Sequence, residues 1–273
     1  MKDKGKLLIL RAMFLVIMIA CLIPVGRSCC QSIQHEQQSR KLRAVHEKSD
    51  STGEKTGNAV GESAGSRETE SEDTEKQMPA IAEKWKELYA KNKDLAGWLI
   101  VEGTKIDYPV MQCEDDEYYL HHNFEREEDK YGCLYVKSIA DINTPGTNFV
   151  IYGHHMKDNS MFGDLDKYES ESFYQEHGKI LFDTLYEERI YEVIAAFRTQ
   201  ITEGEDDTGF KYYQFYQADT EDEFRNFYEN VMKLSLYDTK ATAEFGDTFL
   251  TLSTCSGYAE NGRFVVVAKR ITG

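Results

Sequence analysis

The chain has 273 residues, of which 41% are hydrophobic and only four are proline. This length accommodates one sizeable domain plus tails, and the composition excludes a collagen-like or wholly disordered chain. Acidic residues outnumber basic ones by 48 to 32, which gives a formal net charge of −16. Because this charge repels phosphate backbones, a nucleic-acid partner is not expected.

The N-terminus carries a membrane-targeting pattern. Three lysines at positions 2, 4 and 6 precede an apolar run from Leu7 to Val25 that only Arg11 interrupts. We predict that residues 1–26 are a cytoplasmic basic tip and a single membrane anchor, which places the rest of the chain outside the cell. A cleaved signal peptide is the alternative. The sequence GRSCC at 26–30 lacks a small-x-small cleavage site and therefore favours the uncleaved anchor.

Residues 27–78 form a second region of different composition. They consist mainly of Gln, Ser, Glu, Lys, Thr and Gly, with few apolar side chains. Such a segment buries too little surface to offset the entropy of ordering it. We predict a flexible polar stalk that gives the following domain reach from the membrane.

The folded domain is predicted over residues 79–273. Ile81, Trp85, Leu88 and Tyr89 share one face of an amphipathic helix. After it come eight short runs rich in β-branched and aromatic residues, which predict strands: 97–101, 106–111, 132–136, 148–152, 179–183, 189–197, 248–253 and 264–269. Between the sixth and seventh runs, Phe224 to Leu234 follow a 3.6-residue period after an acidic start. The fold class is therefore mostly β, an eight-stranded closed or nearly closed barrel with an N-terminal helix and one inserted helix.

The cysteines limit the redox chemistry of the domain. Only Cys113, Cys133 and Cys255 lie in the predicted globular part, so at most one disulfide can form there and at least one thiol stays free. A bridge between Cys113 and Cys133 is conceivable outside the cell, but we expect both to be small buried hydrophobes. No CxxC pair is present, which argues against a structural zinc site or a thioredoxin-type centre.

Cys255 is the candidate nucleophile. It ends the predicted strand 248–253 in the sequence TLSTC, where a scaffold can present a reactive group to a loop. Arg263 begins the next strand, and an antiparallel return would bring its guanidinium beside the thiol. A cation there can activate a thiol or stabilise an oxyanion. Taken singly, Cys255 could instead be a small buried side chain and Arg263 a solvated strand end.

A histidine completes the candidate site. The buried-looking strand 148–152 is followed by Gly153, His154 and His155, and an imidazole at a strand end is well placed for proton transfer near neutral pH. Alternatively, this pair is solvated, or it joins His121 and His122 in a zinc site. We expect no metal, because no carboxylate or cysteine stands at recognised ligand spacing.

These motifs in this order resemble those of a class B sortase. The resemblance rests on TLSTC at 251–255, Arg263 at the start of the last strand and the strand with Gly-His at 149–154, and it extends over about residues 79–273. The segment DLAGWLIVEGTKIDYPV at 94–110 and the stretch HHMKDNSMF at 154–162 agree with the family as well. The helix-bearing insertion from about 200 to 245, between strands six and seven, is typical of class B.

The resemblance implies a membrane-anchored extracellular cysteine transpeptidase that needs no cofactor. Cys255 would attack the carbonyl of a Thr in the C-terminal sorting motif of a secreted protein and form a thioacyl enzyme. An amine of a peptidoglycan precursor would then resolve this intermediate. His154 would protonate the leaving amine, and Arg263 would stabilise the oxyanion and position the substrate. Binding of the sorting peptide would fall to Ser253 and Thr254 beside the nucleophile, and to Tyr212 or Tyr213 in the long insertion.

Other functions remain open at this point. A secreted cysteine peptidase would use the same Cys and His with water as acceptor, but it normally adds an Asn, Asp or Gln that orients the imidazole. A sortase that polymerises pili would take its amine from a protein. A non-catalytic surface-binding module would make Cys255 dispensable. Removal of Cys255 separates the module from the enzymes, and an added amine separates transfer from hydrolysis.

Overall fold

A computed structural model describes residues 13–14, 26, 29–49, 80–143, 146–201, 209–256 and 261–271, with the side chains of 255 and 256 outside the description. The chain divides into two compact units, Met1–Ala44 and Val45–Gly273. The predicted catalytic domain lies within the second unit.

One part of the predicted stalk is helical. Residues 29–49 form an α-helix, so the expectation of a flexible segment is wrong for this stretch. Its Gln, Glu, Lys, Arg, Ala and Leu residues have high intrinsic helix propensity, and Arg40 forms an i,i+4 ion pair with Glu36 at 2.8 Å. The argument from burial missed this helix because it weighed only apolar surface. Residues 50–79 lie outside the description.

The predicted membrane anchor is mostly outside the described residues. Of the apolar run from Leu7 to Val25, only Met13 and Phe14 are described. Among the described parts of the chain, no helix has both the length and the apolar character needed to span a bilayer.

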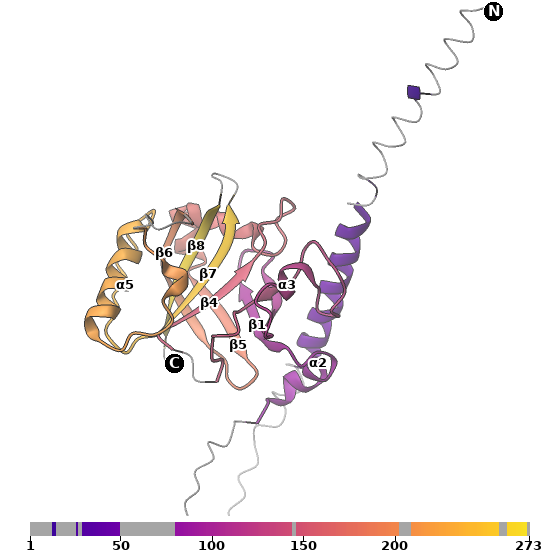
Figure 1. The fold of residues 1–273 in the computed structure, drawn as a ribbon, viewed down its shortest axis with the longest axis horizontal. Helices are drawn as coiled ribbons and strands as arrows, with labels where there is room; N and C mark the ends of the chain where they lie inside the picture. Colours follow the sequence, from indigo (N-terminus) through magenta and orange to yellow (C-terminus); the bar gives the residue numbers. More distant parts are fainter. Residues whose placement is uncertain are drawn as a thin grey trace, which may run out of the picture. The chain divides into compact units, whose positions relative to one another are not determined.

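Eight strands close into a barrel in the order β1-β2-β3-β4-β7-β8-β6-β5, shown in Figure 1. Their bounds are β1 Leu95–Val101, β2 Asp107–Met111, β3 Leu134–Tyr135, β4 Asn148–Gly153, β5 Lys179–Thr184, β6 Ile190–Gln200, β7 Phe249–Ser256 and β8 Gly262–Ile271. The barrel and all eight strands are as predicted. Two neighbouring pairs are parallel, β2 with β3 and β4 with β7.

After residue 80, the helices are short except for α5. They are η1 Glu83–Trp85, α2 Lys86–Lys91, α3 Tyr118–His121, η2 Gly163–Glu169, α4 Glu171–Glu176, η3 Tyr212–Gln214 and α5 Glu221–Leu234. The predicted N-terminal helix is realised as η1 and α2, with Trp85 and Leu88 fully buried. The predicted later helix is α5, which lies between β6 and β7 in chain order. The other elements span too few turns to leave a period in the sequence.

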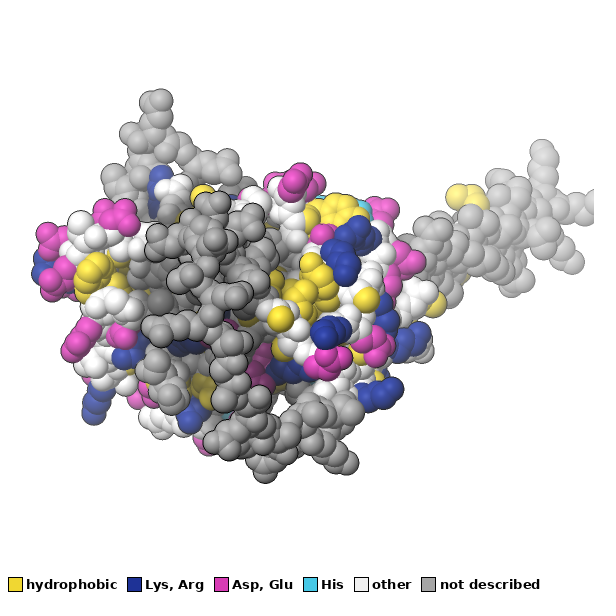
Figure 2. Space-filling view, turned by 90° about the horizontal axis from the view of Figure 1, so that it is seen from below, with side chains coloured by type: hydrophobic (Ala, Val, Ile, Leu, Met, Phe, Trp, Pro, Cys, Tyr) yellow, Lys and Arg dark blue, Asp and Glu magenta, His cyan; other side chains and the backbone are white. Residues whose placement is uncertain are grey.

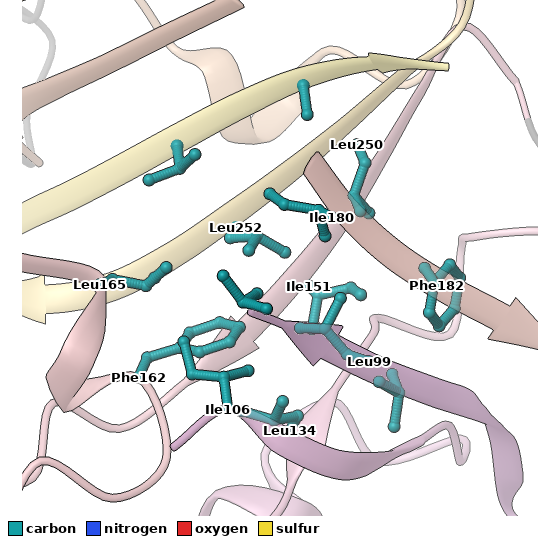
Figure 3. Packing of buried hydrophobic residues seen from close by; sticks show 14 of the residues in the cluster. Leu99, Ile106, Leu134, Ile151, Phe162, Leu165, Ile180, Phe182, Leu250 and Leu252 are labelled. Atoms are coloured by element: carbon teal, nitrogen blue, oxygen red, sulfur yellow. The ribbon is translucent and has the colours of Figure 1, made fainter. Parts of the chain in front are cut away.

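The barrel interior is the main hydrophobic core. Alternate residues of each strand point inward, and Leu99, Ile151, Ile180, Leu250 and Leu252 meet there, each at most 1% exposed. Figure 3 shows these side chains converging from strands that are far apart in the sequence, with Phe162 and Leu165 closing one end. This packing determines which residues of each strand face outward, and the candidate catalytic residues are among those.

A second core lies outside the barrel, where α5 covers β6, β7 and β8. Phe224, Phe227 and Val231 of α5 pack with Phe249 and with the outward-facing residues of β8. A capping box starts the helix: the Thr220 side chain accepts from the Glu223 N–H, and the Glu223 side chain accepts from the Thr220 N–H. These three strands are therefore buried on both faces.

The insertion also covers an edge of β6. β5 pairs with β6 only over residues 190–192, so the next carbonyls of β6 need other partners. The Leu236 N–H donates to Ala196 O at 2.8 Å, and the Thr239 hydroxyl donates to Ile194 O at 2.7 Å. The chain after α5 thus supplies the hydrogen bonds that β5 does not.

The surface charge is mixed locally. Where Figure 2 draws described side chains, Lys and Arg lie among Asp and Glu.

We expect Leu250→Ala to destabilise the domain strongly. Leu250 is fully buried in the barrel core, and a buried Leu→Ala change costs about 2 to 5 kcal/mol through lost burial and the cavity left behind. Denaturant-induced unfolding followed by fluorescence measures the change. Leu236→Ala is the matched control, because that leucine is 49% exposed; equal losses for the two variants would contradict this description of the core.

Candidate active site

The three candidate catalytic residues meet at one end of three adjacent strands. Cys255 on β7 pairs directly with Arg263 on β8. On the other side of β7, the parallel register with β4 ends at Gly153 opposite Thr254, and His154 follows Gly153. The next position along both strands therefore aligns 154 with 255. Since neighbouring strands lie about 4.8 Å apart, the fold places His154, Cys255 and Arg263 in one row.

The row lies on the outer face of the barrel. Leu250, Leu252 and Phe264 belong to the interior core, whereas Phe249 and Val265 belong to the outer cluster. Strand alternation continues the outer set to positions 255 and 263. The side chain of Cys255 itself is outside the description.

The backbone of His154 and its imidazole are both held by hydrogen bonds. The imidazole Nε2 lies 2.7 Å from the carbonyl oxygen of Leu120 in α3, and the His154 carbonyl accepts from the Phe162 N–H at 2.9 Å. A carbonyl oxygen can only accept, so Nε2 must carry a proton. Nδ1 is then the nitrogen that can release or take up a proton.

Sequence reasoning did not find the Leu120 carbonyl. It considered the Asn, Asp or Gln side chain that orients the imidazole in many cysteine peptidases, whereas the partner here is a main-chain oxygen. Every residue has such an oxygen, so no side-chain pattern marks it. The structural signal is the short helix α3, which itself left no period in the sequence.

The second histidine of the pair has a different partner. His155 Nε2 lies 2.7 Å from Asp166 Oδ2 in η2, and His155 forms an isolated β-bridge with Met161. These contacts hold the turn that follows β4. His154 and His155 are therefore adjacent in sequence but contact different parts of the fold.

The four histidines do not assemble into one cluster. His122 Nδ1 lies 2.8 Å from the Tyr118 carbonyl oxygen, and its ring stacks on Tyr118 with centroids 3.9 Å apart. His121 comes within 6.4 Å of His154, centroid to centroid. Among the residues that the structure describes, no group of three His, Cys, Asp or Glu side chains could hold a metal ion.

Three of the four predicted substrate-binding side chains are buried. Ser253, Thr254 and Tyr212 are each 1% exposed, and Tyr213 is half-buried. The hydroxyls of Tyr212 and Ser253 form a hydrogen bond of 2.6 Å. Ser253, Thr254 and Tyr212 thus do not reach the surface in this structure. The Tyr212 contact attaches η3 of the long insertion to β7, next to the candidate nucleophile.

An aromatic group that sequence reasoning missed lies beside His154. Tyr152 is on the outer face of β4, its ring centroid 5.6 Å from that of Tyr135, and Lys137 Nζ lies 5.6 Å from the Tyr152 ring. Burial raises the pKa of Tyr152 and that of Tyr216 above the ordinary range. Both phenols therefore stay neutral, and the surface beside His154 carries aromatic rings with uncharged hydroxyl groups. The signal available in the sequence was strand alternation, which puts Tyr152 on the same face as His154.

The other two cysteines of the domain are free thiols. Cys133 is buried, as predicted, but the expectation of burial is wrong for Cys113, which lies beyond the end of β2 and is partly exposed. Burial raises the pKa of both thiols, and the protonated thiol is a poor nucleophile. Neither thiol competes chemically with a thiolate at position 255.

Comparison with known proteins assigns the family. A family model of the sortase domain matches residues 99–271. Sortase B of Listeria monocytogenes is 33% identical over 195 residues, covering 70% of this chain and 76% of that protein. Sortase B of Staphylococcus aureus is 30% identical over 197 residues, covering 72% and 78%.

Solved structures agree with this assignment. The Staphylococcus aureus sortase B–substrate complex has a TM-score of 0.72 and 26% identity, covering 89% of this chain and 98% of that one. A sortase B complexed with triglycine gives a TM-score of 0.71 at 26% identity, with 89% and 99% covered. Sortase B of Bacillus anthracis in complex with AAEK1 gives 0.63 at 33% identity, with 71% and 86% covered. Fold, site order and relatives agree, and the chain belongs to the sortase family as a class B cysteine transpeptidase.

Proposed function

We propose that the chain anchors secreted proteins to the cell wall by transpeptidation at Cys255. The observation that carries the proposal is the register of β4, β7 and β8, which aligns positions 154, 255 and 263 at one strand end. The predicted N-terminal anchor would keep the enzyme at the outer face of the membrane, where sorting-motif proteins emerge. The substrate-bound relative from Staphylococcus aureus supports a peptide as the donor.

In the first half-reaction, the Cys255 thiolate attacks the carbonyl carbon of a Thr in the sorting motif. The developing oxyanion would receive hydrogen bonds from the Arg263 guanidinium. The C–N bond then breaks, and the imidazolium of His154 gives its Nδ1 proton to the leaving amine. This leaves a thioester on Cys255 and a neutral imidazole protonated at Nε2, which is the tautomer that the Leu120 carbonyl favours.

In the second half-reaction, an amine of a peptidoglycan precursor attacks the thioester carbonyl. His154 Nδ1 takes the proton from the attacking nitrogen, the C–S bond breaks, and the thiolate is restored. The relative complexed with triglycine supports a glycine-type amine as the acceptor. The net charge of −16 also attracts a cationic amine more than an anionic acceptor.

The buried residues near Cys255 take supporting roles in this proposal. Tyr212 and Ser253 would hold η3 against β7 through their hydroxyl contact, and Thr254 would pack inside the strand end. Tyr213 and Tyr152 remain as side chains that could touch the sorting peptide. In this proposal, the sorting peptide contacts the aromatic side chains near His154 rather than the buried residues of β7.

We expect replacement of the proposed catalytic residues to lower turnover far more than replacement of their neighbours. Cys255→Ala should abolish turnover, and His154→Ala should lower it by about 10²- to 10⁴-fold through loss of proton transfer. Arg263→Ala should lower it by about 10²- to 10³-fold through loss of oxyanion stabilisation. Mass spectrometry of products from a small library of sorting-motif peptides, with and without an added amine, measures these effects.

His155→Ala is the matched control, because His155 binds Asp166 and not the reacting groups. It should retain most of the activity. An essential His155 with a dispensable His154 would refute the proposed roles. Product that forms only by hydrolysis, even with saturating glycine peptide, would favour a peptidase. Transfer only to a protein lysine would favour pilus polymerisation.

Thiol labelling should identify Cys255 as the reactive cysteine of the domain. With a brief pulse of a small methanethiosulfonate near neutral pH on protein 79–273, one adduct should form at Cys255 and activity should stop. Cys113 and Cys133 should react slowly, because burial raises the pKa of both thiols and keeps them protonated. Intact-mass analysis with peptide mapping reads the site. Fast labelling of the Cys255→Ala variant would mean that another thiol is the reactive one.

The proposed anchor should determine where the enzyme is found. Full-length protein should fractionate with membranes and retain its N-terminus, whereas protein beginning at residue 79 should be recovered in solution and active. Fractionation with N-terminal sequencing tests this. Recovery of a mature form beginning near Cys29 in the medium would replace the anchor with a cleaved signal peptide.

A further inference from the structure

The Leu120 carbonyl that binds His154 lies in a helix too short to be stable by itself. Helix α3 has four residues, Tyr118–His121, and a helix of one turn is not stable by its own hydrogen bonds. Its C-cap residue, His122, has an extended backbone. Contacts from elsewhere must therefore fix the direction of the Leu120 carbonyl.

Tyr119, the residue before Leu120, is the most strongly held residue of α3. Its side chain is 1% exposed. Its hydroxyl donates to Asp94 Oδ2 at 2.7 Å and accepts from Asn92 Nδ2 at 2.8 Å. Burial raises the pKa of Tyr119, which keeps the hydroxyl available as a donor. The tyrosine thus ties α3 to the segment between α2 and β1.

The residues that receive Tyr119 are themselves held. Asn92 is 2% exposed, and its Nδ2 also donates to the Phe124 carbonyl at 2.8 Å. Arg126 Nη2 donates to Asp94 Oδ2 at 3.0 Å. These contacts join Tyr119 of α3, and Phe124 and Arg126 beyond it, to the segment between α2 and β1. Such networks are rigid when all members are satisfied.

On the other side of α3, the backbone of Gly132 packs closely against the carbonyls of Tyr119 and Leu120. Gly132 has a φ of +57°, and a Cβ added there would lie 2.4 Å from the Tyr119 carbonyl oxygen and 2.7 Å from the Leu120 carbonyl oxygen. The next residue, Cys133, donates its N–H to the Tyr119 carbonyl at 2.8 Å. Only a residue without a side chain leaves room for the Leu120 carbonyl in this direction.

We propose that Tyr119 and Gly132 are positioning residues for catalysis, because together they aim the Leu120 carbonyl at His154 Nε2. The inference rests on the proposed role of His154 and adds the residues that orient its hydrogen-bond partner. The arrangement serves the purpose of the orienting side chain in a Cys-His-Asn site: it selects one tautomer and one ring orientation. Here the orienting atom is on the main chain, so its direction depends on neighbouring side chains.

Removing the Tyr119 hydroxyl is the first test. Tyr119→Phe keeps the ring in place and breaks both hydroxyl hydrogen bonds. We expect kcat for peptide transfer to fall about 10- to 100-fold, since a small misplacement of a catalytic group can have that effect, while KM changes less than about twofold. A purely structural role would lower thermal stability and leave kcat of the folded enzyme unchanged.

Tyr168→Phe is the matched control. Tyr168 is fully buried, and its hydroxyl donates to the His177 carbonyl at 2.7 Å, so the variant loses a comparable hydrogen bond elsewhere. It should lose stability but retain kcat. Asp94→Asn, which keeps an acceptor for Tyr119, should retain more activity than Asp94→Ala. Equal kcat for Tyr119→Phe and Tyr168→Phe would overturn the proposal.

A second measurement does not depend on activity. The imidazole ¹⁵N resonances of neutral His154, assigned by comparison with His154→Ala, report which nitrogen carries the proton. The parent enzyme should show the Nε2–H tautomer, and Tyr119→Phe should show a mixture. If Cys255→Ala kept full activity while this tautomer shift still occurred, the proposed catalysis would fail and the positioning would stand. An unchanged tautomer in Tyr119→Phe would overturn the positioning.

Gly132→Ala tests the other side of the carbonyl. We expect loss of kcat and a mixed His154 tautomer, because the new Cβ displaces the Leu120 carbonyl. Gly246→Ala controls for backbone strain, since Gly246 has a φ of +106° and nothing within 4 Å of an added Cβ. If Gly132→Ala is too unstable to assay, the tyrosine pair above decides the proposal alone. Parent-like kinetics and tautomer in a folded Gly132→Ala would contradict it.

Discussion

The parallel pairing of β4 with β7 is the constraint on which the site depends. All of β4, from Asn148 to Gly153, is in register with β7 from Phe249 to Thr254. A shift of one residue would turn every outward position of β7 inward. The inward leucines of β7 oppose such a shift, because their burial in the barrel core would be lost. Packing of the barrel core therefore fixes the register of β4 against β7, and this register places His154 beside Cys255.

The antiparallel pairing of β7 with β8 completes this alignment from the other side. Arg263 lies opposite Cys255 because the pairing continues without a shift from Phe249 and Lys269 to Ser256 and Gly262. Helix α5 covers the outer face of the same strands, so β7 and β8 are packed on both faces. Strands held in this way keep their twist and register at the end that carries positions 255 and 263.

The sequence predicted the barrel well, because short β-branched and aromatic runs mark the strands. It also placed His154, Cys255 and Arg263 at strand ends, and the pairing of β4, β7 and β8 aligns these three positions. The helix over 29–49 was missed because the face that it buries, His35, Ser39, Leu42 and His46, is mostly polar and leaves no apolar period in the sequence. The Leu120 carbonyl and the Tyr119 contacts were missed for a different reason: they join residues far apart in sequence through a main-chain atom. Ser253 and Tyr212 were assigned to substrate from their position near Cys255, whereas their burial depends on the path of the insertion.

The insertion between β6 and β7 has a second consequence through its last residues. Leu236 and Thr239 satisfy the carbonyls of β6 beyond the point where β5 ends. Without them, a stretch of a long central strand would present unpaired acceptors along an open edge, which is the template for strand addition and self-association. The insertion therefore also protects this edge of β6 from strand addition. A shorter connection would have to end α5 earlier and still return along β6, so covering this edge sets a lower limit on the length of the loop.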